Sequence, residues 1–167
     1  GYPIGAYGGR KEIMELVREE RMNQDTYVWT ASSLGGNPIS CTAALAALNL
    51  YSQEGTYSHL HAIGTYMRDG MRRVLYDQHE EAQVIGDGPL AQVVFSQEPV
   101  TDYRSTKRGD RAKGRRLMLK LFEKGIFLNP MGTKLYLSMM HDQHVCDEFL
   151  NRFHEALIEV KLSTVED

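Results

Sequence analysis

The chain has 167 residues, of which 42% are hydrophobic and 25% are charged, and its formal net charge at pH 7 is −3. This composition is typical of a globular protein, and a slightly acidic chain has no general attraction to nucleic acid or to an anionic membrane. No apolar run approaches the ~20 residues that a membrane-spanning helix requires, so we expect no membrane span.

The first third of the chain is predicted to contain short elements before a long helix. Four glycines and a proline between Gly1 and Gly9 predict a short buried strand or a tight loop where backbones pass closely. Apolar residues at helical spacing predict an amphipathic helix over residues 10–21. The aromatic and β-branched residues 27–30 predict an extended segment.

The most informative stretch covers residues 29–51. Asn37 is a favourable N-cap residue and Pro38 suits the first helical position, so a helix is expected to start there and to end near residues 52–55. The small, glycine-rich segment before it contains Ser32 and Ser33. Hydroxyl groups beside a helix start with free N–H groups predict a site for an anion, most naturally a phosphate. The alternative is a tight turn and cap without a ligand.

Residues 53–56 are predicted to form a linker, because the pattern beyond them changes to that of a small α+β domain. The first expected elements are a helix over 57–79, strands over 83–86 and 90–96 joined by a turn at 87–89, and an irregular segment over 97–108. A helix over 110–124 closed by Gly125 and a short strand over 126–128 follow. The last expected elements are a turn at 129–132, a strand over 134–139 and a helix capped by Asp142.

Helical spacing also predicts which side chains are buried. The expected core residues of the three helices are Leu60, Ile63, Met67, Met71, Val74 and Leu75 in the first, Leu117, Leu121 and Phe122 in the second, and Val145, Phe149, Phe153, Ala156 and Val160 in the third. Gly64 and Gly70 weaken the first helix but are expected to allow close packing against a neighbour.

Two groups of residues suggest binding chemistry, and for both the structural interpretation is preferred. His141 and His144 lie three residues apart near Cys146, but no second pair of ligands is evident, so we predict no metal site and a core role for Cys146. Nine basic residues between 104 and 124 could contact phosphates, yet a solvated helix face is favoured in a chain of negative charge. They are Arg104, Lys107, Arg108, Arg111, Lys113, Arg115, Arg116, Lys120 and Lys124.

Two motifs resemble one known family. The segment S-S-L-G-G-N-P-I-S-C-T-A-A-L-A-A-L and the opening G-Y-P-I-G-A-Y-G-G-R-K-E-I-M are similar to class III pyridoxal-phosphate aminotransferases, nearest to the glutamate-1-semialdehyde aminomutase branch. The resemblance implies an α/β protein of fold type I, with residues 1–52 as the end of the large, cofactor-binding domain at the dimer interface. Residues 57–167 would then form the small C-terminal α+β domain.

The resemblance also implies a cofactor and a reaction. In this family a lysine forms a Schiff base with pyridoxal 5′-phosphate, and that lysine is expected just before Gly1, so no catalytic residue is assigned within this chain. Ser33 matches the hydroxyl residue that binds the cofactor phosphate across the subunit boundary, and Ser32 is its neighbour. A homodimer with shared active sites is therefore expected. The start of the chain does not have the pattern of a signal peptide. The absence of an initiator methionine predicts that the chain begins partway through a longer protein.

The expected substrates are small molecules: an amine or amino acid and a keto or aldehyde acceptor. Some relatives place an arginine for the substrate carboxylate near the turn matching residues 129–133, but no arginine occurs between Arg116 and Arg152, and Lys134 is the nearest cation. An aminomutase, decarboxylase or racemase on the same fold, or a non-catalytic phosphate-binding module, remain alternatives. Two cysteines without a disulfide pattern predict a reduced, cytoplasmic setting.

Overall fold

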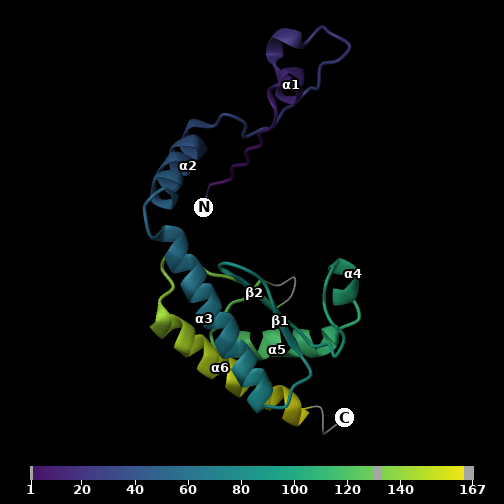
Figure 1. Cartoon of the computed structure of the whole chain (residues 1–167), viewed down its shortest axis with the longest axis vertical. Coiled ribbons are helices and arrows are strands. Elements are labelled where there is room, and N and C mark those ends of the chain that lie inside the picture. The colour runs from purple at the N-terminus through teal and green to yellow at the C-terminus, as the bar shows by residue number, and fades with distance from the viewer. Residues whose placement is uncertain (1, 130–132, 164–167) are drawn as a thin grey trace. The chain divides into compact units, whose positions relative to one another are not determined.

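The computed structural model describes residues 2–129 and 133–163 (Figure 1). The chain divides into two compact units, Gly1–Gln53 and Glu54–Asp167. No helix in the described part of the chain is both long and apolar enough to cross a membrane.

The first unit contains a short α-helix and two 3-10 turns followed by one long helix. The short elements are α1 (Lys11–Met14), η1 (Glu15–Val17) and η2 (Glu19–Arg21), and the long helix is α2 (Pro38–Tyr51). The single helix predicted over residues 10–21 is wrong, because Arg18 has an extended backbone with φ −73° and ψ 131°. Short helices are marginal without tertiary packing, and no side chain of these three elements is buried.

The glycine-rich N-terminal segment also differs from the prediction of a short buried strand. Residues 2–9 are exposed and adopt no regular secondary structure, and residues 27–30 form neither helix nor strand. A strand requires a partner for its backbone N–H and C=O groups, and the described residues of this unit supply none for residues 2–9.

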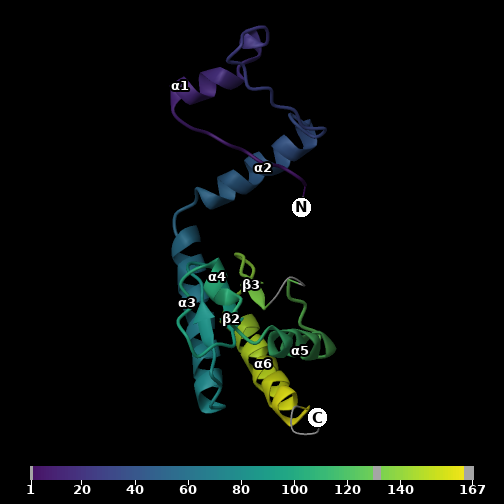
Figure 2. The same ribbon diagram turned by 90° about the vertical axis from the view of Figure 1, so that its right-hand side faces the viewer.

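The second unit combines a three-stranded antiparallel sheet with helices (Figures 1 and 2). Its elements are α3 (Thr56–Asp77), β1 (Gln83–Ile85), β2 (Leu90–Val94), α4 (Tyr103–Thr106), α5 (Arg111–Glu123), β3 (Lys134–Tyr136) and α6 (Gln143–Ser163). The strand order is β1-β2-β3, with Ile85 opposite Gln92 and Gln92 opposite Lys134. The predicted long helices and strands are confirmed, apart from shorter strands, whereas α4 was missed and residues 126–128 form no strand.

One face of this sheet packs on the helices and forms the core. Val84, Ala91, Val93 and Leu135 share a hydrophobic cluster with residues of α3, α5 and α6. The predicted buried face of α3 is confirmed, since its residues are buried except for half-buried Val74. In α6 the prediction for Val145 is wrong: it is 40% exposed, while the adjacent Cys146 is fully buried.

Two glycines of α3 let other segments approach its backbone closely. A Cβ atom on Gly64 would meet the carbonyl oxygen of Gly88 at 1.9 Å, and one on Gly70 would meet the side chain of Leu150 at 2.4 Å. The close packing predicted for both glycines is therefore confirmed. Arg68, which is buried, donates from Nη1 to the carbonyl oxygens of Gly88 and Leu90, so it holds the turn before β2 against α3.

Candidate functional site

The segment before α2 forms a compact hydrogen-bonded bend. The amide of Gly35 donates to the carbonyl oxygen of Ser32 at 3.0 Å, and the amide of Asn37 donates to that of Leu34 at 3.1 Å. Gly36 has φ +68°, a left-handed conformation that glycine adopts without strain. The bend therefore exposes a short run of backbone and hydroxyl groups immediately ahead of the helix.

The N-cap of α2 occupies the first amides of the helix. Asn37 Oδ1 accepts from the amides of Ile39 at 3.0 Å and Ser40 at 3.1 Å, and the Asn37 carbonyl oxygen accepts from Cys41. The cap and the position of Pro38 at the helix start are confirmed. The prediction that helix-start N–H groups are free for an anion is wrong, because Asn37 satisfies them.

The two predicted serines have different environments within the bend. Ser32 Oγ accepts a hydrogen bond from the amide of Leu34 at 3.3 Å, so its oxygen helps to shape the bend. Ser33 is exposed, and neither its hydroxyl nor its amide donates to another residue in the described ranges. The amide of Gly36 likewise donates no hydrogen bond to a described residue. These donors fit a phosphate, which accepts several hydrogen bonds at once.

The unit that contains this bend has almost no interior of its own. Within residues 2–53 only Ser40 is buried, while many large apolar side chains are at least 47% exposed. These side chains are Tyr2, Ile4, Tyr7, Ile13, Met22, Val28, Trp29, Leu34, Ile39, Leu45, Leu48, Leu50 and Tyr51. Extensive exposed apolar surface marks a site of interaction with other protein surface.

Of the two histidines, His141 has a local hydrogen-bonding role. His141 Nδ1 accepts from the amide of Ser138 at 3.0 Å, and Asp142 caps α6 by accepting from the amide of Val145 at 2.9 Å. Cys146 is confirmed as a core residue, and burial, together with the negative charges of Asp147 and Asp142, raises its pKa to about 11. No cluster of three or more His, Cys, Asp or Glu residues with metal-binding geometry occurs within the described ranges.

Four of the nine basic residues around α5 form ion pairs. Arg108 pairs with Glu98 at 2.6 Å and Lys113 with Glu80 at 2.5 Å. Lys120 pairs with Glu123 at 2.7 Å, and hydrogen bonding to this carboxylate is the main reason why the pKa of Lys120 is raised. Hydrogen bonds to Glu159 and then Glu155 similarly raise the pKa of Lys124. A purely solvated face is therefore an incomplete description of this segment.

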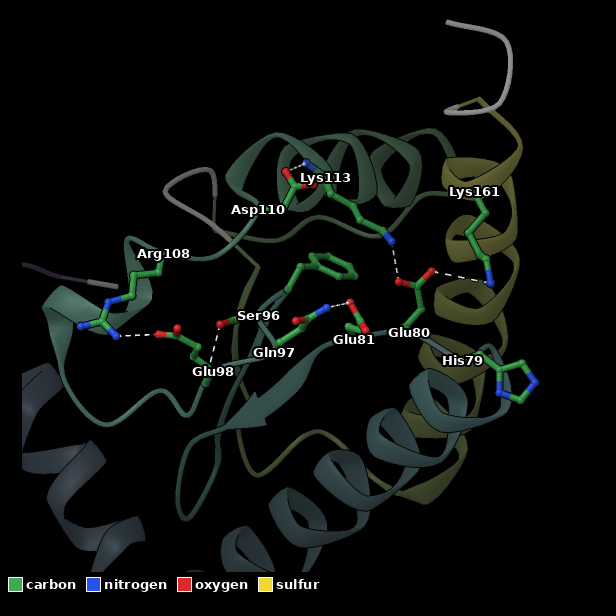
Figure 3. Close-up of a pocket in the computed structure, with 11 residues that line it drawn as sticks. His79, Glu80, Glu81, Ser96, Gln97, Glu98, Arg108, Asp110, Lys113 and Lys161 are labelled. Carbon is green, nitrogen blue, oxygen red and sulfur yellow. Dashed lines mark hydrogen bonds and ion pairs between the residues drawn. The ribbon is translucent and has the colours of Figure 1, made fainter.

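A hollow of about 650 Å³ beside β2 contains two of these pairs (Figure 3). The Glu80 side chain is only 4% exposed and points between Lys113 and Lys161. The Nζ atom of Lys161 lies 3.8 Å from Glu80 Oε1. Lys113 also lies over the ring of Phe95, 5.0 Å from its centroid. Because each of its three Lys and Arg side chains pairs with a carboxylate, we interpret this hollow as a structural network that joins the segment after α3 to α5 and α6.

Comparisons with known proteins match nearly the whole chain. A family model described as "Aminotransferase class-III" matches residues 1–157. Glutamate-1-semialdehyde 2,1-aminomutase of Thermomicrobium roseum is 32% identical over 161 residues, which are 96% of this chain and 36% of that protein. The corresponding aminomutase of Nitrosopumilus maritimus is 30% identical over 164 residues, covering 96% of this chain and 38% of that protein. The chain thus spans little more than a third of these curated relatives.

Solved structures agree with this match. An omega-transaminase from Sphaerobacter thermophilus superposes with a TM-score of 0.80 at 25% identity, over 92% of this chain and 35% of that one. A glutamate-1-semialdehyde aminomutase from Pseudomonas aeruginosa shares the fold, with a TM-score of 0.66 at 16% identity over 79% of this chain and 31% of that one.

Proposed function

This chain belongs to the class-III aminotransferase family, and from this premise we propose that the complete protein is a pyridoxal-phosphate-dependent aminotransferase. The family resemblance and the fold type I architecture predicted from the sequence are confirmed. The supporting observation for the activity is the continuous match to aminomutases and transaminases across both units. The amino group would move between an amine or amino acid and a carbonyl acceptor.

Pyridoxal 5′-phosphate would supply an electron sink and a carbonyl carbon for the substrate amine. The proposed contribution of this chain is to hold the phosphate end. Ser33 would donate its hydroxyl and amide hydrogens, and the amide of Gly36 would add a further donor from the same bend. Ser32 would keep the bend in shape through its contact with the amide of Leu34. We assign no residue of this chain to the Schiff base.

The exposed apolar surface of the first unit supports a homodimer with shared active sites. Thirteen large apolar side chains of this unit lie in solvent when the chain is alone. Burying such surface against the rest of the enzyme and a second subunit would provide the main driving force for assembly. In that arrangement Ser33 would contribute to a site completed by the partner subunit. A cytoplasmic location stays a prediction from the cysteine content.

A second candidate reaction is the aminomutase reaction, in which the amino group moves within one substrate. The names of the curated relatives favour this candidate, whereas the name of a solved neighbour favours a transaminase. Substrate choice distinguishes the two, because an aminomutase needs no separate carbonyl acceptor. The evidence for the family does not depend on which reaction applies.

The deciding experiment uses the complete protein, purified in the presence of pyridoxal 5′-phosphate. We expect a yellow protein whose visible absorption is lost on borohydride treatment and shifts when an amino donor is added. A panel of donors and acceptors would then identify the transferred group, with glutamate-1-semialdehyde as the test for the aminomutase reaction. A protein that folds but does not take up the cofactor would contradict the proposal.

A further inference from the structure

A second hollow, of about 600 Å³, lies where α4 and the start of α5 meet β2 and β3. Four cationic side chains line it, from three separate parts of the chain: Lys107 after α4, Arg111 and Arg115 on α5, and Lys134 at the start of β3. The sequence grouped the first three with a solvated helix face. The fold brings them together with the fourth around one cavity.

These four cations lack, among the described residues, the acidic partners that several neighbouring cations have. None of the four forms an ion pair with a residue of the described ranges, in contrast to Arg108, Lys113, Lys120 and Lys124. The acidic residue lining the hollow is Asp110, and its Oδ1 accepts from the amide of Lys113 at 2.8 Å as the N-cap of α5. The hollow therefore has a net positive charge.

The placement of the two arginines is unfavourable for the helix itself. Arg111 and Arg115 are four residues apart, so their like charges face the same side of α5. Arg111 lies at the helix N-terminus, where the helix dipole is positive and acidic residues are preferred, yet after the N-cap Asp110 the first turn of α5 contains no acidic residue. A bound anion would relieve both repulsions. Local choices that oppose stability are expected at functional positions.

The walls of the hollow favour a small organic anion over a hydrated inorganic ion. Buried Val94, Phe95 and Met118 line it, and buried Thr133 uses its hydroxyl to donate to the carbonyl oxygen of Val93. Such walls can cover the carbon skeleton of an organic anion, which a hydrated inorganic ion does not have. Tyr103 adds an aromatic edge, with Lys107 Nζ 5.2 Å from its ring centroid.

We propose that this hollow is a binding site for a small carboxylate, with Arg111 and Arg115 as its principal ligands and Lys134 and Lys107 as additional cations. A guanidinium group matches the two oxygens of a carboxylate with parallel N–H donors, which the point charge of a lysine does not. The carboxylate has two possible sources. It belongs either to the amino-group substrate, in which case the inference rests on the proposed function, or to a separate effector that binds away from the reaction.

The experiment measures binding of succinate to the complete holoenzyme by isothermal titration calorimetry, once at a low NaCl concentration and once at 0.3 M NaCl. Arg111→Gln and Arg115→Gln should each weaken succinate binding about tenfold or more, and salt should weaken binding to the parent protein. Arg73→Gln is the matched control, because Arg73 is exposed on α3 and forms no ion pair with a described residue. It should bind succinate within about twofold of the parent protein.

Equal binding by the parent protein and both α5 variants would overturn the proposal, as would an equal loss in Arg73→Gln. Inorganic phosphate serves as a comparison, and binding of phosphate with no binding of succinate would also overturn it. Both arginines are exposed, and a thermal unfolding scan checks that each variant is folded.

Steady-state kinetics then separate the two sources of the carboxylate. If the site holds the substrate, the α5 variants should raise KM for a donor with a carboxylate and leave KM for a simple amine unchanged. If the site holds an effector, the variants should lose succinate binding with KM unchanged for both donors. A protein without any amino-transfer activity would contradict the proposed function, whereas the calorimetric result would still test the anion site.

Discussion

Gly64 and Gly88 touch backbone to backbone: a methyl group on Gly64 would lie 1.9 Å from the carbonyl oxygen of Gly88. Arg68, one turn further along α3, donates to the same carbonyl oxygen. The turn that precedes β2 is therefore positioned directly by α3. Because β2 is the central strand, this contact sets the sheet on its helices.

Gly64→Ala should lower the free energy of unfolding by about 3 kcal/mol, because neither backbone can move aside without disturbing the core. Gly114→Ala is the matched control in another helix, where an added Cβ meets nothing within 4 Å. It should raise stability by roughly 0.5–1 kcal/mol, as expected for alanine in a helix. Urea unfolding of the complete protein checks both variants, and similar midpoints for the two would contradict the predicted contact.

Removing one partner of the Glu80–Lys113 pair should destabilise the protein far more than removing one partner of the Glu98–Arg108 pair at the other end of the same hollow. Lys113→Met leaves the Glu80 carboxylate, which is 4% exposed, with only Lys161 nearby at 3.8 Å. The Lys113→Met substitution should therefore lower the free energy of unfolding by about 3 kcal/mol. Arg108→Gln breaks a pair whose side chains are 66% and 65% exposed, with an expected effect under about 1 kcal/mol.

Thermal unfolding at constant ionic strength compares these two variants. The double variant Glu80→Leu/Lys113→Met provides a further check, because it removes both charges. It should recover most of the stability lost in Lys113→Met. If Arg108→Gln proves as damaging as Lys113→Met, burial is not the property that determines the strength of these pairs.

Cys146 should make the protein less stable as the pH rises above 9. Burial raises the pKa of this thiol from an ordinary value of 9.0 to about 11, so the folded state keeps its proton while the unfolded state loses it. The stabilisation is complete below pH 9 and is lost progressively as the pH rises, and at pH 11 the free energy of unfolding should be about 2 kcal/mol lower than below pH 9. Cys146→Ala should flatten the pH dependence over this range, relative to the parent and to Cys41→Ala.

The same burial predicts chemical protection. Iodoacetamide at pH 8 should leave Cys146 unmodified in the folded protein and modify it in urea, as peptide mass spectrometry would show. Modification of Cys146 in native protein at the rate seen in urea would show that α6 does not bury the thiol.

Ser33→Ala in the complete enzyme should weaken binding of pyridoxal 5′-phosphate about tenfold, because one hydrogen bond to a charged phosphate is removed. Ser33→Thr keeps the hydroxyl and should bind nearly as well as the parent. Ser52→Ala is the control: its hydroxyl donates to Asn49 at the other end of α2. Absorbance titration of the apoenzyme gives the dissociation constants for the cofactor. An unchanged dissociation constant for Ser33→Ala would contradict the proposed contact between Ser33 and the phosphate.

Sequence patterns were reliable where an element is long and packs on a core. The periodicity of α3 and α6 predicted both helices and most of their buried residues. The exceptions are half-buried Val74 and exposed Val145, whose neighbour Cys146 lies on the buried face of α6. Patterns were less reliable where packing is absent, as in the broken helix around Arg18. The short α4 escaped detection because its capping box, between Asp102 and Ser105, stabilises four residues without a periodic apolar face.

The amino-acid sequence by itself determined the family, the order of the main elements and the cap at Asn37, because motifs and helical spacing are properties of neighbouring residues. Only the structure showed that, once Asn37 has capped these amides, the bend at Ser33 holds the donors that remain exposed ahead of α2. It likewise decided that Lys113 is paired with Glu80 while Arg111 and Arg115 share a hollow with Lys134. Charges distant along the chain become partners or stay unpaired only when the fold sets the distances between them, and electrostatic energy depends on those distances.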